Sequence, residues 1–217
     1  MKLPVTIHHA RLGADQFRVI RPARSLTHAL LTDRDWHLAA YLDQDAARTI
    51  AGLWMLAARS PRSLIHLPIR ANRPPSCDAP STTSPRLDLV LLHHSLQFAP
   101  ARWKQVRQRL SPGRPQTATL PETDHITEMT IDYAARHYRE NRDRFHQHLH
   151  AETLFMSGSA QVFRETAGRF LDIARQGPGF VPTHPNYPHF CTELHVGDGI
   201  LAHARELHIE YCDQWTD

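Results

Sequence analysis

The sequence lacks the features of a membrane or secreted protein. No apolar run approaches the length of about 18 residues that a membrane-spanning helix needs. The N-terminal stretch MKLPVTIHHARL has no long apolar core of the kind found in signal peptides. We therefore expect a cytoplasmic protein with no membrane partner.

Cysteine is also scarce. The chain has three cysteines, Cys77, Cys191 and Cys212, and no Cys-x-x-Cys motif. An odd number without paired spacing argues against a disulfide framework and against a zinc site built from cysteines. Cys191 and Cys212 fall in predicted strands, where a buried cysteine most often acts as a small apolar residue.

Lysine is nearly absent, with Lys2 and Lys104 as the only two among 25 Lys and Arg residues. The net charge is only +3. The densest basic group is Arg136, Arg139, Arg142 and Arg144. Acidic residues interrupt this group, which is typical of a solvated helix face, whereas a nucleic-acid-binding protein concentrates its positive charge. The expected partner is therefore a small molecule or a protein, and not a nucleic acid.

Histidine, in contrast, is abundant. The 17 histidines are spread along the whole chain and do not form one tract. An exposed imidazole has a pKa near 6.5 and gains positive charge as the pH falls. We therefore expect solubility and stability to depend on pH between about 5 and 7.

Residues 1–217 are predicted to form a single α/β domain, because apolar residues make up 41% of the chain and suffice for one core. The predicted fold is a Rossmann-like, mostly parallel sheet with an N-terminal β-hairpin, a long two-helix segment at 124–176 and two C-terminal strands. Alternating or continuous apolar patterns place strands at 5–12, 17–20, 36–43, 63–69, 87–93, 190–196 and 206–212.

Helical spacing of apolar residues predicts four helices. The first follows Asp43 or Asp45 as its N-cap, and the last ends at Gly177 and Pro178. The segment 71–85, rich in Pro, Ser and Thr, is predicted to be a mobile loop. The predicted helices span about 45–60, 99–110, 124–156 and 160–176.

Polar side chains end three of the predicted strands: Asp43, then Arg70 with Asn72, then His93 with His94. In an open parallel sheet, ligands bind at the carboxyl ends of the strands. If the three strands were parallel neighbours, these side chains would meet at one rim. We therefore predict a site in which His93 or His94 acts as general acid or base and the other three bind the ligand.

The segment LDLVLLHHSLQFAPARWKQVRQRLSPGR, residues 87–114, resembles the fourth strand and following helix of class I S-adenosylmethionine-dependent methyltransferases. The resemblance covers residues 36–114. It implies that 63–69 is the third strand and that Asp43 holds the ribose of the cofactor. The family's glycine-rich turn has no counterpart, because residues 19–35 contain no glycine. No cofactor is predicted, and the residues favour a Rossmann-like sheet with a different ligand.

Two groups on the predicted long helix have the spacing of metal ligands. His146 and His150 lie four residues apart, and His125 and Glu128 lie three apart, so each pair would share a helix face. With 17 histidines in the chain, such spacings are also expected in a hydrated helix face. We therefore predict no metal ligand set.

The favoured hypothesis is a small-molecule-binding α/β protein, such as a group-transfer enzyme, with its site at the carboxyl rim of the sheet. The alternative is a non-enzymatic interaction module: an inhibitor, immunity or regulatory protein. A metal hydrolase at the histidines of the long helix is a third hypothesis. A deep pocket lined by Asp43 and His93 would favour the enzyme, whereas a shallow rim with an exposed apolar patch would favour the interaction module.

Overall fold

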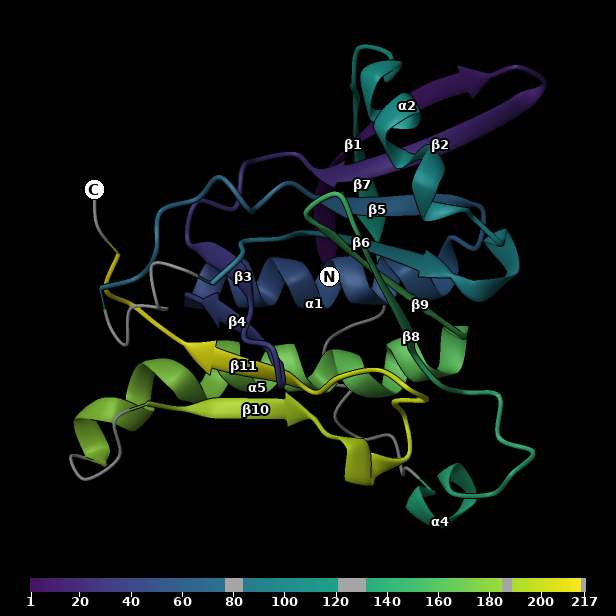
Figure 1. Cartoon of the computed structure of the whole chain (residues 1–217). Coiled ribbons are helices and arrows are strands. Elements are labelled where there is room, and N and C mark those ends of the chain that lie inside the picture. The colour runs from purple at the N-terminus through teal and green to yellow at the C-terminus, as the bar shows by residue number, and fades with distance from the viewer. Residues whose placement is uncertain (77–83, 121–131, 185–188, 216–217) are drawn as a thin grey trace.

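The computed structural model describes residues 1–76, 84–120, 132–184 and 189–215. Two sheets and two long helices form the body of the protein (Figure 1). Helix α1 (Gln44–Arg59) packs along helix α5 (Ala160–Thr183), and both contribute to one continuous apolar core with the inner faces of the sheets. No helix in the described ranges is long and apolar enough to span a membrane.

The larger sheet has seven strands. Two strand pairs in it are parallel, β2 with β5 and β6 with β9, and the other pairs are antiparallel. The α/β class is confirmed, but the sheet is mixed and not mostly parallel, so a Rossmann-like sheet is not confirmed. The strands in sheet order are β7 (Arg114–Thr119), β1 (Lys2–Leu12), β2 (Asp15–Pro22), β5 (Ser63–Leu67), β6 (Asp88–His93), β9 (Thr153–Gly158) and β8 (His146–His150).

The smaller sheet has four strands and lies below the larger one in Figure 1. Its central pair, β11 with β4, is parallel, and its outer pairs are antiparallel. The strands in sheet order are β10 (Cys191–Leu194), β11 (Leu207–Tyr211), β4 (Leu38–Leu42) and β3 (Ala29–Asp33). In the described residues the remaining elements are the short helices α2 (Trp103–Gln108) and α4 (Tyr133–Arg136) and the 3-10 turns η1 (His94–Leu96), η2 (Pro100–Arg102) and η3 (Val196–Asp198).

The body of the fold is built from two halves with the same order of elements. The first half is β3–β4–α1–β5–β6, and the second is β8–β9–α5–β10–β11. Each half gives one strand pair to each sheet, and the pairing β5–β6–β9–β8 has the same directions as β10–β11–β4–β3. The sequence shows no repeat, so this duplicated topology is a finding of the structure.

Helix α1 forms where the sequence predicted it. Asp43 is the N-cap, and its Oδ1 accepts a hydrogen bond from the Ala46 backbone N–H at 2.7 Å. Trp54 lies in the buried stripe of the helix and packs against the rings of Phe145, Phe163 and Phe170. This aromatic cluster joins α1 to α5 at the centre of the protein.

Helix α5 continues to Thr183, so the end predicted at Gly177 and Pro178 was wrong. A Cβ on Gly177 would overlap the ring of Tyr211, so glycine is required there by close packing of the helix on β11. Pro178 has no N–H for the Ala174 carbonyl four residues earlier. The Gln44 side chain donates to that carbonyl instead, at 2.9 Å.

The long helix predicted over 124–156 was also wrong. Residues 121–131 lie outside the described part of the chain, and the rest forms α4 and the hairpin β8–β9. Ala151 and Glu152 make the turn with positive φ of 47° and 57°. The apolar spacing that suggested the helix runs through Ala134, Tyr138, Phe145 and Leu149, which lie in α4, in the segment between α4 and β8, and in β8.

The remaining predictions for the fold were mixed. The strands at 36–43, 63–69, 87–93, 190–196 and 206–212 and the N-terminal hairpin are confirmed within a few residues, whereas β3 and β7 were missed. Part of the predicted loop 71–85 lies outside the described residues, and 71–76 has no helix or strand. Cys212 is disulfide-bonded, contrary to the expectation from cysteine spacing.

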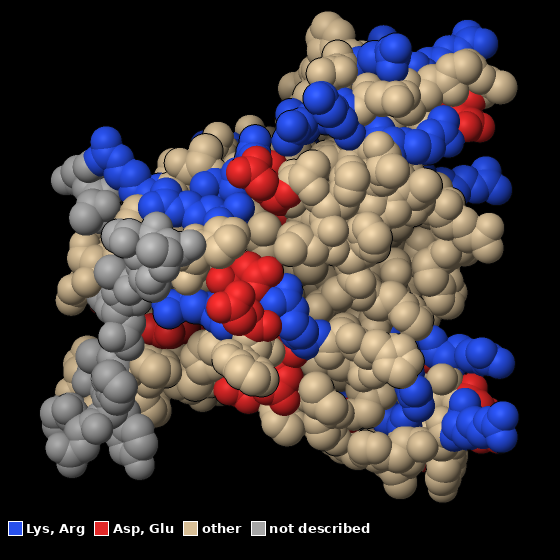
Figure 2. All heavy atoms as spheres, viewed as in Figure 1, with Lys and Arg blue, Asp and Glu red and all other residues tan. Residues whose placement is uncertain are grey.

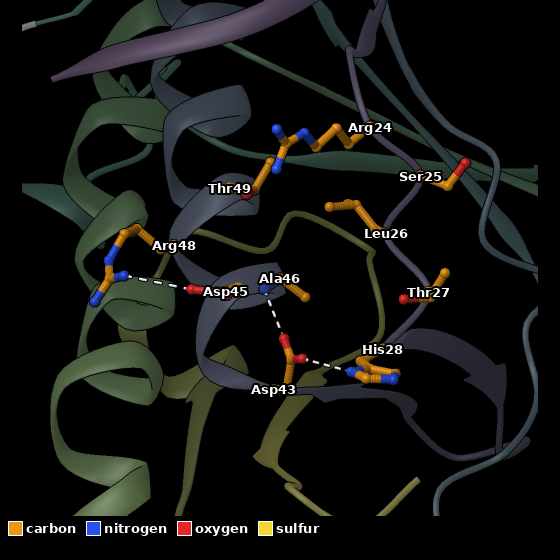
Figure 3. A pocket seen from close by; sticks show the side chains of 10 residues that line it. All are labelled: Arg24, Ser25, Leu26, Thr27, His28, Asp43, Asp45, Ala46, Arg48 and Thr49. Carbon is orange, nitrogen blue, oxygen red and sulfur yellow. Dashed lines mark hydrogen bonds and ion pairs between the residues drawn. The ribbon is translucent and has the colours of Figure 1, made fainter. Parts of the chain in front are cut away.

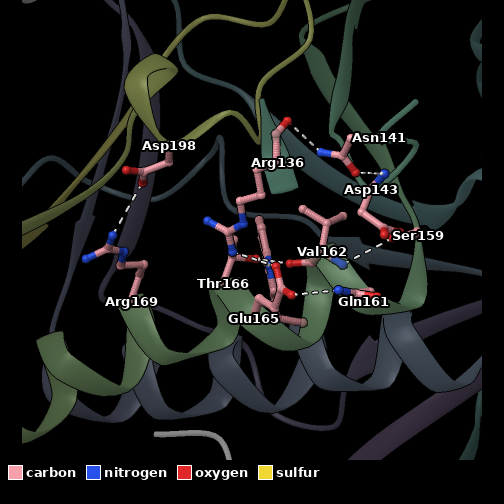
Figure 4. A network of polar contacts seen from close by, with 11 residues as sticks. Arg136, Asn141, Asp143, Ser159, Gln161, Val162, Glu165, Thr166, Arg169 and Asp198 are labelled. Atoms are coloured by element: carbon pink, nitrogen blue, oxygen red, sulfur yellow. Dashed lines mark hydrogen bonds and ion pairs between the residues drawn. The ribbon is translucent and has the colours of Figure 1, made fainter. Parts of the chain in front are cut away.

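Helix α4 is tied to α5 by a buried ion pair. Arg136 contacts Glu165 with Nη2 2.5 Å from Oε2, and their side chains are only 8% and 7% exposed (Figure 4). The side chain of Asn141 donates to the Arg136 carbonyl, and Gln161 donates to the second oxygen of Glu165. The arginine-rich segment is therefore partly a structural network and not only a solvated face.

Candidate functional site

The three strand ends predicted to meet do not share a rim. Strand β4, which leads to Asp43, belongs to the smaller sheet, and β5 and β6 are neighbours in the larger sheet but antiparallel. The end of β5 therefore lies beside the start of β6, away from His93. The predicted site of Asp43, Arg70, Asn72, His93 and His94 therefore does not form. The polar residues at strand ends do not determine which strands pair or in which direction.

His93 and His94 have local partners. His93 Nδ1 accepts from the Ser95 N–H at 3.2 Å and from the Ser95 hydroxyl at 2.7 Å, which caps the turn η1. The two imidazole rings meet edge to face with centroids 4.5 Å apart. Burial and the neighbouring His94 lower the pKa of His93, so the ring stays neutral at neutral pH.

Arg70 and Asn72 serve separate parts of the fold. The Arg70 backbone N–H donates to Asp88 Oδ1 at 3.1 Å, and its guanidinium pairs with Asp88 and Glu152. The Asn72 amide donates to the carbonyls of Leu26 and Ala29. Asn72 therefore fixes the segment that enters β3, and Arg70 belongs to a charged cluster at the start of β6.

That charged cluster surrounds His66, whose side chain is 1% exposed. Arg21 Nε donates to His66 Nδ1 at 3.0 Å, so the neutral ring carries its proton on Nε2, which lies 3.8 Å from Asp88 Oδ2. Burial lowers the pKa of His66 and outweighs the opposing effect of Asp88. Burial raises the pKa of Asp88, but His66 and the Arg70 groups outweigh it, and the carboxyl stays ionised. Trp103 covers the imidazole.

A polar pocket of about 400 Å³ opens at the N-terminus of α1 (Figure 3). One wall is the segment 24–28 before β3, and the other is the first turns of α1 from Asp43 to Thr49. Asp43 Oδ2 lies 2.8 Å from His28 Nδ1, while Oδ1 caps the helix. Because a carboxylate only accepts hydrogen bonds, His28 Nδ1 carries a proton and Nε2 is the basic nitrogen.

Charges of both signs surround this pocket. Figure 3 shows the guanidinium of Arg24 extended toward Thr49 across the pocket. On the opposite side, Arg48 pairs with Asp45 at 3.5 Å. The His28 ring stacks on Trp215 with centroids 5.3 Å apart and remains 49% exposed. The pocket can therefore bind an anionic group at Arg24 and exchange a proton at His28.

Sequence reasoning found Asp43 but missed His28 and Arg24. Asp43 was recognisable because it stands directly before an amphipathic helix. His28 precedes β3, a strand that was not predicted, and fifteen positions separate it from Asp43. Only the antiparallel pairing of β3 with β4 brings the two side chains together.

Neither residue pair with the spacing of metal ligands forms a site in the described part of the chain. His146 and His150 lie at the two ends of strand β8, roughly 13 Å apart at about 3.3 Å per residue, which is too far for one ion. His125 and Glu128 lie outside the described residues. Metal-ligating atoms do converge on the smaller sheet, at His189, Cys191 and His208, and this group shares no residue with the pocket.

No family model matches the chain, and no curated protein or solved structure gives a significant match. The candidate site is therefore defined by its own geometry.

Proposed function

We propose that the protein binds a small polar molecule with an anionic group in the pocket at the N-terminus of α1. His28 acts there as a general acid or base in group transfer or hydrolysis. The observation that carries the proposal is the fixed Asp43–His28 pair, with Oδ2 2.8 Å from Nδ1. It replaces the rim site predicted around His93 and His94.

The Asp43 carboxylate is held on both sides. Its Oδ1 accepts a hydrogen bond from the Ala46 N–H in the first turn of α1 at 2.7 Å, and its Oδ2 accepts one from His28. The carboxylate group therefore cannot rotate freely. This arrangement sets the tautomer of the imidazole and directs Nε2 away from the carboxylate. A partly exposed ring with a fixed tautomer is suited to proton transfer.

Arg24 supports an anionic ligand. Its side chain is exposed and extends over the pocket toward Thr49, so a phosphate or carboxylate could accept from both groups. The N-terminus of the 16-residue helix α1 adds a favourable dipole for negative charge. The ligand class we favour carries an anionic group beside hydroxyls or another acceptor for the proton.

The methyltransferase resemblance stays a prediction. In the structure Asp43 caps α1 with Oδ1 and contacts His28 with Oδ2, so its carboxylate is part of the proposed acid–base pair. We therefore route no step of the proposed chemistry through S-adenosylmethionine.

The test compares binding and turnover in matched variants. Phosphate, pyrophosphate, citrate and glucose 6-phosphate serve as binding probes in thermal shift, and p-nitrophenyl phosphate and p-nitrophenyl acetate as reporters of hydrolysis. We expect Arg24→Ala to weaken binding about tenfold, because one charge-assisted hydrogen bond is lost. His28→Asn should abolish turnover and leave probe binding nearly unchanged.

Asp43→Ser separates the two roles of Asp43. Serine still caps α1 but gives His28 no carboxylate partner, so stability should hold while turnover falls. His148→Asn on β8 is the matched control for replacing an exposed histidine. Absence of any probe binding, or wild-type turnover in both His28→Asn and Asp43→Ser, would contradict the proposal.

A specific observation supports the alternative of an interaction module. Trp36, at the tip of the β3–β4 hairpin, is 90% exposed. Arg205 holds this tip by pairing with Asp33 at 2.5 Å and donating to the Asp35 carbonyl at 3.0 Å. On the face drawn in Figure 2, a broad area over β6, β8 and β9 also carries few charged side chains. An exposed tryptophan on a hairpin held in this way is typical of a protein-binding residue.

This alternative is tested by placing a photo-crosslinking amino acid at position 36 in cells that produce the protein. A discrete crosslinked product that is absent when the label is placed at Arg62 would favour the interaction module. No product at position 36, together with probe binding in the α1 pocket, would favour the enzyme.

A further inference from the structure

Five side chains with metal-ligating or carboxylate groups share one face of the β10–β11 ladder. Cys191 and Glu193 alternate along β10, and His189 continues the same alternation just before it. His208 and Glu210 alternate along β11. The antiparallel register pairs Cys191 with Glu210 and Glu193 with His208, so the two rows stand opposite each other.

This face points away from the main core. The alternate residues of β11, Leu207 and Ile209, are buried in the core that includes α5. On β10, Thr192 donates its hydroxyl to the Arg169 carbonyl of α5 at 3.1 Å. Cys191 and Glu193, on either side of Thr192, therefore lie on the opposite face of the sheet.

The ligating atoms are close enough to surround one ion. One atom each from His189, Cys191 and His208 lie within 4.8 Å of one another. Glu210, 7% exposed, places carboxylate oxygens 3.9 Å from His189 Nδ1 and 3.9 Å from His208 Nε2. Ligands of a tetrahedral zinc ion stand roughly 3.3–3.6 Å apart at normal bond lengths, so a shift of about 1 Å closes the site.

Glu193 gives the site an orienting group. Its Oε1 lies 3.0 Å from His208 Nδ1, so that nitrogen carries the proton and Nε2 is left to bind a metal. A carboxylate behind the outer nitrogen of a ligating histidine is the common second layer of zinc sites, where it fixes the ring and raises its basicity.

We propose that His189, Cys191, His208 and Glu210 bind a single transition-metal ion of the Zn²⁺ class. Two imidazole nitrogens, one thiolate and one carboxylate suit Zn²⁺ or Co²⁺, whereas Mg²⁺ and Ca²⁺ prefer oxygen ligands alone. The thiol proton of Cys191 leaves on binding, and its sulfur bonds to the metal. This site is independent of the α1 pocket, so either proposal can fail without the other.

The test uses the full chain without a histidine tag, because 17 native histidines already offer weak metal sites. Co²⁺ is titrated and the absorption band of cobalt–thiolate bonding is followed. We expect one equivalent of Co²⁺ to give this band and Zn²⁺ to remove it by displacement. Cys191→Ser should abolish the band, and His208→Asn should weaken Zn²⁺ binding more than tenfold. His150→Asn, on a different sheet, is the matched control and should bind as the wild type does.

A second measurement does not require any variant to fold. Cys191 is the only free cysteine in the described part of the chain, so its alkylation by iodoacetamide can be followed by peptide mass spectrometry. Zn²⁺ at one equivalent should protect it, and Mg²⁺ should not. Stoichiometric Co²⁺ binding without a thiolate band, or alkylation of Cys191 that Zn²⁺ leaves unchanged, would overturn the proposal.

Discussion

Trp54 and Phe170 meet with ring centroids 4.6 Å apart, and they occupy the same position in the two halves of the fold. Each stands eleven residues after the side chain that caps its helix, Asp43 for α1 and Ser159 for α5. The Trp54 indole N–H also donates to the Thr166 hydroxyl at 2.8 Å. The contact between the helices thus lies where the two halves face each other, and it joins them into one core.

The first prediction concerns this bond. Thr166→Val should lower the free energy of unfolding by about 1–3 kcal/mol, because it leaves a buried indole N–H without an acceptor. Trp54→Ala should cost about 3–5 kcal/mol through loss of packing. The double variant Trp54→Phe/Thr166→Val should cost less than the sum of Trp54→Phe and Thr166→Val measured singly, since no donor is left unpaired. Urea denaturation measures each value.

Trp36→Ala is the matched control, because that tryptophan is 90% exposed. It should change the free energy of unfolding by less than about 0.5 kcal/mol. Additive costs of the Trp54 and Thr166 changes would show that the bond contributes nothing.

The second prediction concerns the ion pair between α4 and α5 (Figure 4). Glu165→Gln should destabilise the protein by about 3–5 kcal/mol, because the guanidinium of Arg136, 8% exposed, would lose its buried counter-charge. Asp198→Asn removes the partner of Arg169, which is 38% exposed, and should cost about 0–1 kcal/mol. Thermal and urea denaturation measure the loss of stability in both variants. Equal losses for Glu165→Gln and Asp198→Asn would show that burial does not strengthen the Arg136–Glu165 pair.

Local signals allowed much of the first half to be predicted. Asp43 before an amphipathic stripe marked α1, and short apolar runs marked β4, β5 and β6. These signals depend on neighbours in the sequence. They predict where helices and strands lie in the sequence. They do not predict that β4 pairs with β11, because that pairing depends on contacts between distant segments.

The second half was mispredicted because tertiary contacts override local preference. Pro178 normally ends a helix, yet α5 continues, and Gln44 satisfies the Ala174 carbonyl that Pro178 leaves without a backbone donor. The apolar spacing that suggested one helix over 124–156 runs from α4 into β8, which are separate elements of the fold. The candidate site was missed for the same reason, since His28 meets Asp43 only through strand pairing.

The third prediction assigns part of the pH dependence expected from the histidine content to His66. Burial lowers the pKa of His66 against the attraction of Asp88, and Arg21 and Arg107 act in the same direction as burial. The unfolded chain therefore binds a proton near pH 6.5 that the folded protein does not. The free energy of unfolding is therefore unaffected by the titration of His66 above about pH 6.5. Below that pH it falls by at most about 1.4 kcal/mol per pH unit, because only the unfolded chain takes up the proton.

His66→Asn removes this titration while keeping an acceptor for Arg21. The melting temperature of the variant should therefore fall less between pH 7 and pH 5 than that of the wild type. His148→Asn, an exposed control on β8, should follow the wild type. If His66→Asn shows the wild-type pH dependence, the buried imidazole is not the source.

The fourth prediction concerns the pair of Asp33 and Arg205 below the Trp36 hairpin. The hydrogen bond from Arg205 is the main cause that lowers the pKa of Asp33 below its usual value of 3.8. A carboxyl with a lowered folded-state pKa stabilises the protein above the unfolded value, and this stabilisation is lost as the pH falls through the folded value. Asp33→Asn should therefore be less stable than the wild type at pH 7, and the difference should shrink below about pH 4.

Asp45→Asn provides the comparison, because Asp45 also pairs with an arginine but is 89% exposed. Its effect should be small at every pH, since exposed pairs contribute little. The measurement is the free energy of unfolding in urea from pH 7 to pH 3. A constant gap between wild type and Asp33→Asn across this range would show that the pair does not titrate with folding. The Trp36 hairpin tip would then be held by the bond from Arg205 to the Asp35 carbonyl, which does not depend on the charge of Asp33.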